Sequence, residues 1–382
     1  MQNLTCKYSY KCGGCTELST PYEDQLKKKR KFVQKCLEQE GIEFPVSTCE
    51  GMYYPYKYRN KIHLAITEHK GTTKIGFFEE HSNKVQAVSK CLLFDDWAMK
   101  LIELTHEYIE SFKIVGYNKE TRTGTLRYVV ARMLDNAISV TLVATTQNFP
   151  GKEIFYKKLK ETFKNVSFYL NINRRTDNAV FDEKYFVHKA GSPRLKGSLM
   201  GVNFELSPNS FYQTNEKIMV KMYTKAIELL NIQDNEKILD LYSGIGITSM
   251  LFAKKGADVQ SIEVSKSSVT NAIHNIKLNN LQSKIYANLG TCKDVITKLQ
   301  PPKNCKVFLD PARSGAEIET LQTLIKFEPS LIVYMSCNPE SLAGDLKILL
   351  ESKKYNLTYV QPYDMFPQTK HVEVLACLQR KI

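Results

Sequence analysis

The chain has 382 residues, of which 43% are hydrophobic and 24% charged, a composition that excludes a disordered or fibrous protein. It shows neither an apolar run long enough to span a bilayer nor the apolar core of a secretory signal, so a cytoplasmic protein without a membrane partner is expected. The net charge of +13 favours a polyanionic partner such as nucleic acid. The excess lies mainly in residues 1–205, which hold 32 Lys+Arg against 23 Asp+Glu, whereas residues 206–382 hold 21 against 17.

The first half of the chain begins with helical spacing and continues with strand patterns. Residues 21–39 have apolar positions near helical spacing and are followed by Gly41, which predicts a helix with one core face. The basic run at 27–31 falls largely on its other side, where a solvated face is expected. From about residue 50 to 205, short strand-like runs are separated by turn residues such as Asp135-Asn136. This region is predicted to be a mostly antiparallel β domain with helical insertions.

After residue 206 apolar strands alternate with helical stretches. The strand-like runs are KILDLYSG, DVQSIEVS, KVFLDPA and LIVYMSCNP. Such alternation predicts a Rossmann-like, doubly wound α/β domain with a mainly parallel sheet. The expected organisation is a cysteine motif in 1–20, a basic β-rich region suited to nucleic acid in 21–205, and a catalytic α/β domain in 206–382.

Ligands of such sheets bind beyond the carboxyl ends of the strands, and the informative residues fall there. Gly244 and Gly246 close the first strand, where they allow a tight turn and close approach of a ligand. Glu263 ends the second strand, at the usual place of an acid that binds ribose hydroxyls, and Asp310 ends a later one. The loop continues Ile247-Thr248-Ser249 without the third glycine of a dinucleotide fingerprint. A mononucleoside cofactor therefore fits better than a nicotinamide dinucleotide.

Cys337 is a candidate nucleophile. It follows an apolar strand and precedes Asn338 and Pro339, which suit the cap and first turn of a helix. At a helix amino terminus the dipole stabilises a thiolate, so the pKa of Cys337 is expected to fall below its usual value of about 8.5.

The closing segment offers a general base. His371 and Glu373 alternate with two valines in a strand-like pattern and so share one face. A glutamate shielded from water gains basicity, which makes Glu373 the better candidate and His371 the second.

Five motifs follow one another in this half: SPNSFYQTN at 207–215, LYSGIG at 241–246, DPARSG at 310–315, SCNP at 336–339 and DMFPQTKHVE at 364–373. In this order they resemble the motifs of the RNA uracil-5-methyltransferase family. The resemblance implies that 206–382 form a class I methyltransferase domain that uses S-adenosylmethionine. Two residues depart from the family pattern: Ala312 replaces its usual second proline, and Ile247 replaces an asparagine of many members.

The resemblance also implies roles for single residues. Cys337 would add to a uracil and Glu373 would remove the proton from its carbon 5, so that a uridine in structured RNA is methylated there. The target base must then leave its stack to become accessible. The residues that the resemblance assigns to S-adenosylmethionine are Gln213, Tyr242, Gly244, Gly246, Glu263 and Asp310.

Ten cysteines without a secretory signal favour metal or catalytic use over disulfides. Cys6, Cys12 and Cys15 are spaced C-x5-C-x2-C, and Cys91 can be a distant fourth ligand. Four thiolates suit structural zinc and an iron-sulfur cluster equally well, and the spacing is not the C-x3-C-x2-C of radical enzymes. The resemblance to bacterial ribosomal-RNA members and some archaeal relatives implies a [4Fe-4S] cluster.

The chain begins at these cysteines without a preceding small β-barrel, which resembles the compact iron-sulfur enzymes that act on 23S ribosomal RNA. Ribosomal RNA is therefore the expected substrate, and a monomer the expected state. The same reaction on the T-loop uridine of transfer RNA is the alternative. A non-catalytic RNA-binding or folding factor is a second alternative, which the intact motifs around Cys337 and Glu373 disfavour. Basic candidates for RNA contact in the β region are Arg59, Lys61, Arg127 and Arg132.

Overall fold

The structure is a computed structural model that describes residues 4–302 and 304–381. The chain divides into two compact units. Unit 1 consists of residues up to Ser19, Pro55–Gly197 and Glu205–Thr214. Unit 2 consists of Thr20–Tyr54, Ser198–Phe204 and the residues from Asn215 onward. The division differs from the expected one, because Thr20–Tyr54 belong with the α/β domain and not with the β-rich region.

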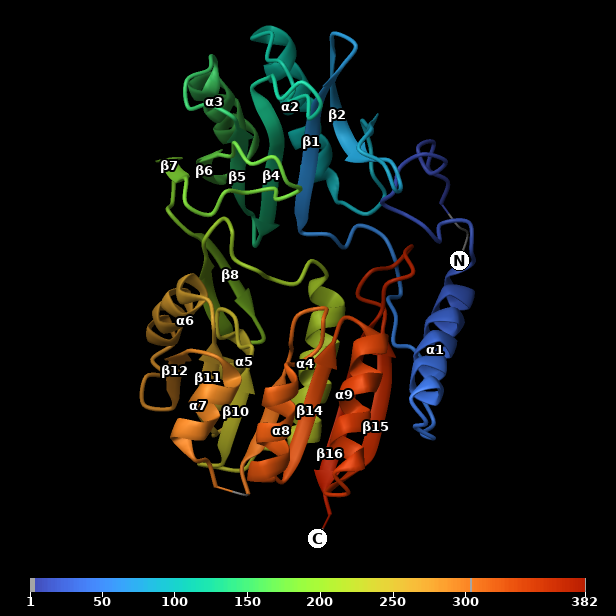
Figure 1. Cartoon of the computed structure of the whole chain (residues 1–382). Helices are drawn as coiled ribbons and strands as arrows, with labels where there is room; N and C mark the ends of the chain where they lie inside the picture. The colour runs from blue at the N-terminus through green and yellow to red at the C-terminus, as the bar shows by residue number, and fades with distance from the viewer. Residues whose placement is uncertain (1–3, 303, 382) are drawn as a thin grey trace. The chain divides into compact units, whose positions relative to one another are not determined.

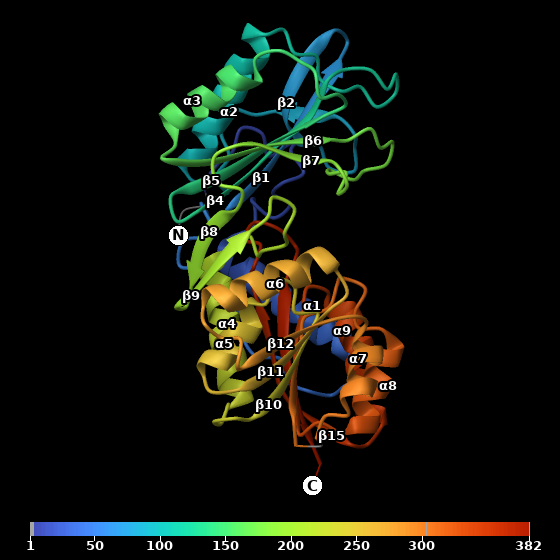
Figure 2. The same ribbon diagram turned by 90° about the vertical axis from the view of Figure 1, so that its left-hand side faces the viewer.

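Unit 1 is built on a seven-stranded sheet in the order β3-β2-β1-β4-β5-β6-β7. Neighbouring strands are antiparallel except β5 and β6, which are parallel, as expected of a mostly antiparallel region. The helices α2 and α3 cover one face of this sheet (Figure 2). The elements are β1 (Lys61–His69), β2 (Thr72–Phe78), β3 (Val85–Ala87), α2 (Asp96–Ser111), β4 (Leu126–Leu134), β5 (Ala137–Ala144), α3 (Lys152–Thr162), β6 (Asn165–Ile172) and β7 (Phe186–Ala190).

The residues of unit 1 explain its hairpins and its layers. Asp135 and Asn136 join β4 to β5 with φ values of 43° and 65°, the left-handed conformation that a two-residue hairpin turn requires. In β1, Ile62 and Leu64 are fully buried, and the alternation of a strand places Lys61 on the opposite face. Strands β8 (Leu195–Leu199) and β9 (Val202–Leu206) form a separate two-stranded sheet.

Unit 2 contains a second seven-stranded sheet, ordered β12-β11-β10-β13-β14-β16-β15. Its strands are parallel from β12 to β14, and β16 runs antiparallel to both β14 and β15. This confirms the predicted α/β fold. The elements are α1 (Tyr22–Gln39), α4 (Glu216–Leu230), β10 (Lys237–Leu241), α5 (Ile247–Lys254), β11 (Asp258–Glu263), α6 (Lys266–Leu278), β12 (Ile285–Leu289), α7 (Cys292–Leu299), β13 (Lys306–Leu309), α8 (Ile318–Phe327), β14 (Leu331–Ser336), α9 (Pro339–Glu351), β15 (Tyr355–Tyr363) and β16 (Glu373–Arg380).

Helices cover both faces of the sheet in unit 2. Figure 2 shows α4, α5 and α6 on one side of the strands and α7, α8 and α9 on the other. The helix α1 lies against α9 (Figure 1). Its apolar residues Val33, Cys36 and Leu37 are part of the core that the sheet and α9 form. This packing explains why the helix belongs to unit 2.

Lys29 corrects the expectation of a solvated basic face on α1. Its side chain is 3% exposed and forms an ion pair with the fully buried Asp364. The ammonium also donates to the carbonyl of Phe366 at 3.2 Å, and the hydroxyl of Tyr22 donates to Asp364 at 2.7 Å. The helix is thereby attached to the loop that leads to Glu373. Helical spacing did not reveal this, because the partner lies 335 residues away.

Replacing Lys29 with methionine is expected to lower the free energy of unfolding by about 3–5 kcal/mol, because Asp364 would keep a buried charge without its partner. Denaturant unfolding measures the effect. Lys27→Met is the matched control, since Lys27 is 70% exposed and its loss of charge should cost less than about 1 kcal/mol. Equal stabilities of the two variants would show that the buried pair contributes nothing.

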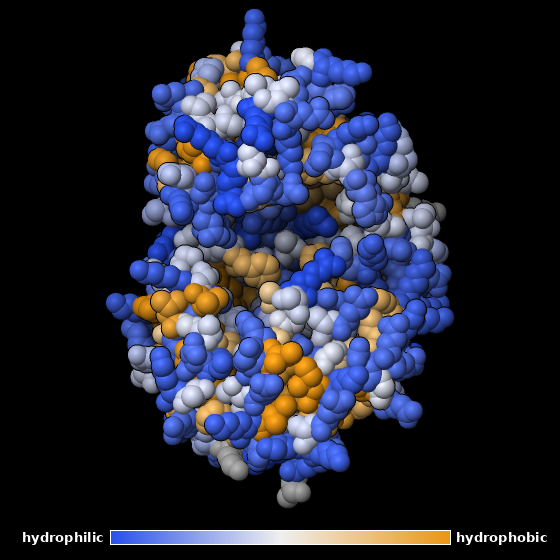
Figure 3. Space-filling view, in the orientation of Figure 1, coloured by the Kyte–Doolittle hydropathy of each residue, from blue (hydrophilic) through white to orange (hydrophobic). Residues whose placement is uncertain are grey.

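No helix in the described ranges is both long and apolar enough to cross a membrane. On the face that Figure 3 shows, hydrophilic residues cover most of the surface and hydrophobic residues form small groups between them.

Candidate active site

The loop after β10 has an unusual backbone that leaves space for a ligand. Tyr242, Gly244 and Gly246 have φ values of 60°, 55° and 82°, all in the left-handed region. A Cβ atom on Gly246 would lie 3.3 Å from the Cβ of Ala272, so the loop packs closely on α6. A Cβ on Gly244 would meet no described atom within 4 Å. The loop is therefore tight on its inner side and open at Gly244.

Glu263 lies beside this loop, as the sequence predicted. The N–H of Gly244 donates to Oε2 of Glu263 at 3.0 Å, and the N–H of Ser265 donates to Oε1 at 2.7 Å. These bonds fix the carboxylate at the end of β11, and each oxygen retains a lone pair that a hydroxyl group can use.

Tyr242 makes a contact that the sequence did not indicate. Its hydroxyl donates to the carboxylate of Glu317, which precedes α8. Glu317 comes from a different strand connection, so no local pattern could have paired the two residues.

Asp240 is a second residue that sequence reasoning missed. It is fully buried, and the hydroxyls of Thr248, at 2.7 Å, and of Ser249 donate to its Oδ2. Its Oδ1 is buried without a hydrogen-bond partner among the described residues. Burial raises the pKa of Asp240 to about 6. The signal available in the sequence was its place near the end of the strand, the same position that identified Glu263.

Asp240, Asp310 and Glu373 form a group that we call the carboxylate cluster. Burial and the carboxylates of Glu373 and Asp240 raise the pKa of Asp310 well above its usual value. Burial and then the charges of these three carboxylates raise the pKa of Tyr223 of α4, which shows that Tyr223 lies near all three. Three buried carboxylates without a described cation beside them make an environment that favours a positively charged ligand.

Cys337 follows the last residue of β14 and precedes α9. Asn338 caps this helix by accepting from the N–H of Glu340 at 3.2 Å, and Pro339 occupies its first turn, as predicted. The expected fall in the thiol pKa is not found. Burial, together with Glu373 and Asp310, raises the pKa of Cys337 to about 11. Burial and the two carboxylates therefore raise the thiol pKa by more than the helix dipole lowers it.

Glu373 begins β16, the strand that pairs antiparallel with β14. Ser336, the last residue of β14, is the register partner of Val374, so Cys337 follows β14 at the end where Glu373 begins β16. The side chain of Glu373 is buried, and its Oε2 has no hydrogen-bond partner among the residues described. Burial raises its pKa to about 7. His371 is exposed and lies outside the strand.

Gln213 belongs to unit 1, where its carbonyl accepts from Nδ2 of Asn60 at 3.0 Å. Its assignment to the cofactor site stays a prediction.

The three cysteines of the first motif and Cys91 lie around one cavity in unit 1. The cavity measures about 210 Å³, and its lining includes Cys6, Cys12, Cys15, Cys91 and Arg59. Burial and the nearby Cys91 raise the pKa of Cys15 to about 12. Over residues 4–302 and 304–381, no group of three or more His, Cys, Asp or Glu side chains is arranged to hold a single metal ion. The four thiols thus lie around one cavity, but among the described residues they do not form a site for a single metal ion.

Two of the four arginine and lysine candidates for RNA contact are buried and held by structural partners. Arg127 is buried, donates to the carbonyls of Asn173 and Arg175, and lies over the ring of Tyr117 at 4.5 Å. Arg132 is buried and donates to the carbonyl of Ser210 at 3.0 Å. Neither guanidinium is presented at the surface.

Comparison with known proteins gives consistent matches over nearly the whole chain. The family described as tRNA (Uracil-5-)-methyltransferase matches residues 21–381. An uncharacterized RNA methyltransferase of Halalkalibacterium halodurans is 32% identical, over 98% of this chain and 83% of that protein. Another, from Caldanaerobacter subterraneus, is 34% identical over 99% of this chain and 84% of that protein.

A solved structure is also similar. The Pyrococcus abyssi tRNA (uracil-54, C5)-methyltransferase in complex with S-adenosyl-L-homocysteine superposes with a TM-score of 0.78 and 29% identity. The match covers 96% of this chain and 86% of that one.

Proposed function

Because the chain belongs to the tRNA (uracil-5-)-methyltransferase family and is thus an S-adenosylmethionine-dependent RNA methyltransferase, we propose that Cys337 and Glu373 methylate carbon 5 of a uridine in structured RNA. The observation that supports these roles is the antiparallel pair β14 and β16. In this pair, Cys337 directly follows β14 at the end where the buried Glu373 begins β16. The free Oε2 of Glu373 can accept a proton without first breaking a hydrogen bond.

S-adenosylmethionine would be held at the carboxyl ends of β10, β11 and β13, by Gly244, Glu263 and Asp310 with Tyr242, Gly246 and Gln213. Glu263 suits the ribose hydroxyls, and the open space at Gly244 lets the backbone approach the ligand. When bound, the cofactor supplies a methyl group on a positively charged sulfur. That charge suits the carboxylate cluster, which has no described cation of its own.

The reaction uses two groups of the protein in sequence. The thiolate of Cys337 adds to carbon 6 of the uracil, which makes carbon 5 electron-rich enough to take up a methyl group. Glu373 then removes the proton from carbon 5, and the electron pair of that bond expels the thiolate from carbon 6. A positive ligand beside Asp310 and Glu373 would offset the carboxylate charges that raise the pKa of Cys337, so cofactor binding would favour the thiolate.

The RNA is proposed to be ribosomal, with 23S RNA as the first candidate, because the cysteine set resembles that of the iron-sulfur enzymes that modify it. Transfer RNA is the second candidate, favoured by the similarity to the Pyrococcus abyssi enzyme. The proposal places the protein in the cytoplasm as a monomer. Incubating it with labelled S-adenosylmethionine and total RNA of a strain that lacks its gene, then mapping the labelled uridine, tests both. A label on neither RNA would contradict the proposed function.

The four thiols of unit 1 are proposed to hold a [4Fe-4S] cluster. Four cysteines around one cavity match the number of ligands that such a cluster takes. A cubane cluster is larger than one ion, so its ligands stand farther apart than those of zinc. The four thiols line a cavity, which suits the larger group.

Protein purified without oxygen is expected to be brown and to contain about four irons per chain, since one cubane cluster takes four thiolates. Elemental analysis and the visible spectrum give the result. Cys15→Ser should lose the iron, whereas Cys49→Ser, at a cysteine outside the motif, should keep it. Colourless protein with one zinc per chain would replace the cluster by a structural zinc site.

A further inference from the structure

The face of the unit 1 sheet on which Lys61 lies has an unusual charge distribution. Lys61 of β1 and Arg132 of β4 are register partners, so two positive side chains stand directly opposite each other on one face. Like charges in this position destabilise a strand pair. The residues that the register and the strand alternation place next to this pair on the same face are His63, Val130, Ser139 and Thr141, and none is a carboxylate.

The two cations of this pair are placed differently. Arg132 is 5% exposed, and its guanidinium is held by the carbonyls of Ser210 and Tyr212, so it contributes a fixed charge. Lys61 is partly exposed, and its ammonium lies 5.9 Å from the ring of Phe181. Within the described ranges, the ammonium of Lys61 makes no ion pair and no hydrogen bond, so its N–H donors are available to a ligand.

The neighbours of Lys61 add to the unfavourable electrostatics. Packing of the surrounding protein and the charge of Arg132 lower the pKa of Lys61 to about 7. The surrounding protein, Lys61 and Arg132 lower the pKa of His63 even though the residue is exposed, so its ring is neutral and offers an N–H donor. An anion between these groups would remove the repulsion and restore the charge of the lysine.

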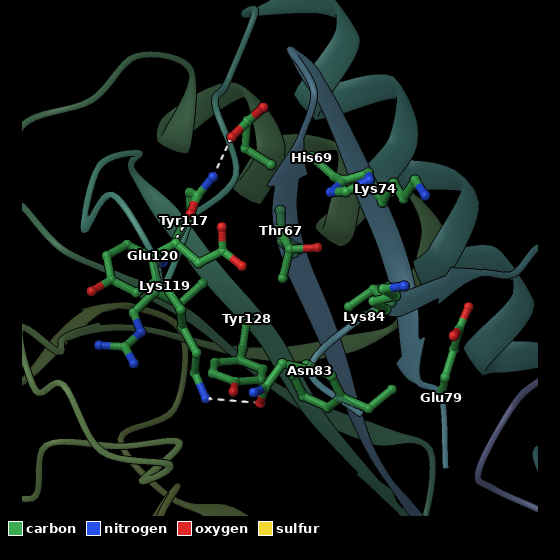
Figure 4. A pocket seen from close by; sticks show the side chains of 16 residues that line it. Thr67, His69, Lys74, Glu79, Asn83, Lys84, Tyr117, Lys119, Glu120 and Tyr128 are labelled. Carbon is green, nitrogen blue, oxygen red and sulfur yellow. Dashed lines mark hydrogen bonds between the residues drawn. The ribbon is translucent and has the colours of Figure 1, made fainter. Parts of the chain in front are cut away.

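A second pocket of unit 1, lined by residues of β1, β2 and β4, has a different charge distribution. It measures about 230 Å³, and Figure 4 shows lysines and glutamates together on its walls, among them Lys74, Lys84, Glu79 and Glu120. Lys119 there bonds to Asn83 and Asn178. Charges of both signs offset each other in this pocket, so it gives no reason to expect an anion.

We infer that Lys61, with the fixed charge of Arg132 opposite and the ring of His63 beside it, binds one phosphate of the RNA backbone. The inference rests on the proposed function for the identity of the anion. A phosphate contact of this kind holds the RNA in position and does not read its sequence. Lys61 is thus a positioning residue.

Lys61→Met tests the site through the salt dependence of RNA binding. With a labelled oligouridylate of about 12 nucleotides as the probe, the slope of log affinity against log salt should become shallower by about 0.7, the value of one lost phosphate contact on a single strand. Lys61→Arg should keep the wild-type slope. Lys158→Met is the matched control with the same loss of charge, because Lys158 is exposed and pairs with Glu107 at 2.5 Å. Equal slopes for Lys61→Met and Lys158→Met would overturn the inference.

Thermal melting separates binding from a structural role. Removing Lys61 relieves a like-charge pair, so Lys61→Met should melt at or above the wild-type temperature while its RNA binding weakens. Lower melting together with an unchanged salt slope would make Lys61 a structural residue. Inorganic phosphate that displaces the oligouridylate at micromolar concentration would make the site one for a free anion and would overturn the RNA assignment.

Failure of the inference and failure of the proposed function give different results. If both are correct, Lys61→Met raises KM for RNA several-fold and leaves kcat near the wild-type value. If wild-type protein transfers no methyl group but shows the salt-slope difference, the phosphate site stands and the proposed reaction fails. If methyl transfer occurs and the slope is unchanged, only the phosphate site fails.

Discussion

Replacing Cys337 with alanine is expected to abolish methyl transfer, by more than about 10⁴-fold, because no other group can make carbon 5 of the uracil reactive. Binding of S-adenosylmethionine should change little, since the thiol acts on the base and not on the cofactor. The variant also keeps Asp310 and Glu373, the two carboxylates of the cluster that lie near Cys337. Transfer of labelled methyl groups to RNA and calorimetry with the cofactor measure the two properties.

Cys49→Ala is the control for the loss of a partly buried cysteine elsewhere in the chain, and it should retain methyl transfer. If Cys337→Ala turns over at the wild-type rate, the covalent mechanism is wrong. If the variant loses cofactor binding as well, Cys337 supports the cofactor site and its role as a nucleophile is not established by the loss of activity.

Glu373→Gln is expected to stop the reaction after methylation, with the RNA still attached to Cys337. Glutamine keeps the size of the side chain but cannot accept a proton at neutral pH, so the carbon 5 proton stays and the thiolate cannot leave. The adduct should run as a slow band on a denaturing gel and carry label from the methyl group. It should disappear in the double variant that also lacks Cys337.

The other outcomes of this experiment are equally informative. Free turnover without a slow band would assign proton removal to water or to His371. An inactive variant without an adduct would show that Glu373 acts before methylation, for example by orienting the uracil. The wild-type rate should also rise with pH through the region near 7, because burial raises the pKa of Glu373 to about 7 and only the unprotonated carboxylate can act as a base. In Glu373→Gln, the rate at which the adduct forms should not show the rise with pH that the carboxylate of Glu373 causes.

Local patterns predicted the part of the site that each strand supplies by itself. The positions of Gly244, Glu263 and Asp310 followed from where a strand ended, and the structure places Gly244 and Glu263 in hydrogen-bond contact. The cap at Asn338 was likewise local, since a capping residue acts on a backbone N–H two residues away.

Properties that depend on several strands could not be obtained in this way. The helix dipole indicated a low pKa for Cys337, but burial, Glu373 of β16 and Asp310 after β13 raise it. The same holds for Tyr242 and Glu317, whose contact joins two strand connections. Spacing in one segment does not reveal which charges the fold brings to it.

The helix α1 shows the same limit at the level of domains. Its apolar spacing was visible in the sequence, but its buried Lys29 and its place in unit 2 depend on a loop near residue 364. Sequence neighbourhood therefore assigned it to the β-rich region, whereas packing assigns it to the α/β unit.

The distance between these partners has a consequence for how the protein is made. On the ribosome, Lys29 emerges long before Asp364, and β16, which carries Glu373, emerges after the other strands of the described residues. Most of unit 1 is the continuous stretch Pro55–Gly197, so it can fold while synthesis continues, whereas Lys29 of α1 finds its partner only after Asp364 has been made. A nascent chain therefore lacks its proposed base until β16 has been made, and before that point it cannot complete the proposed reaction.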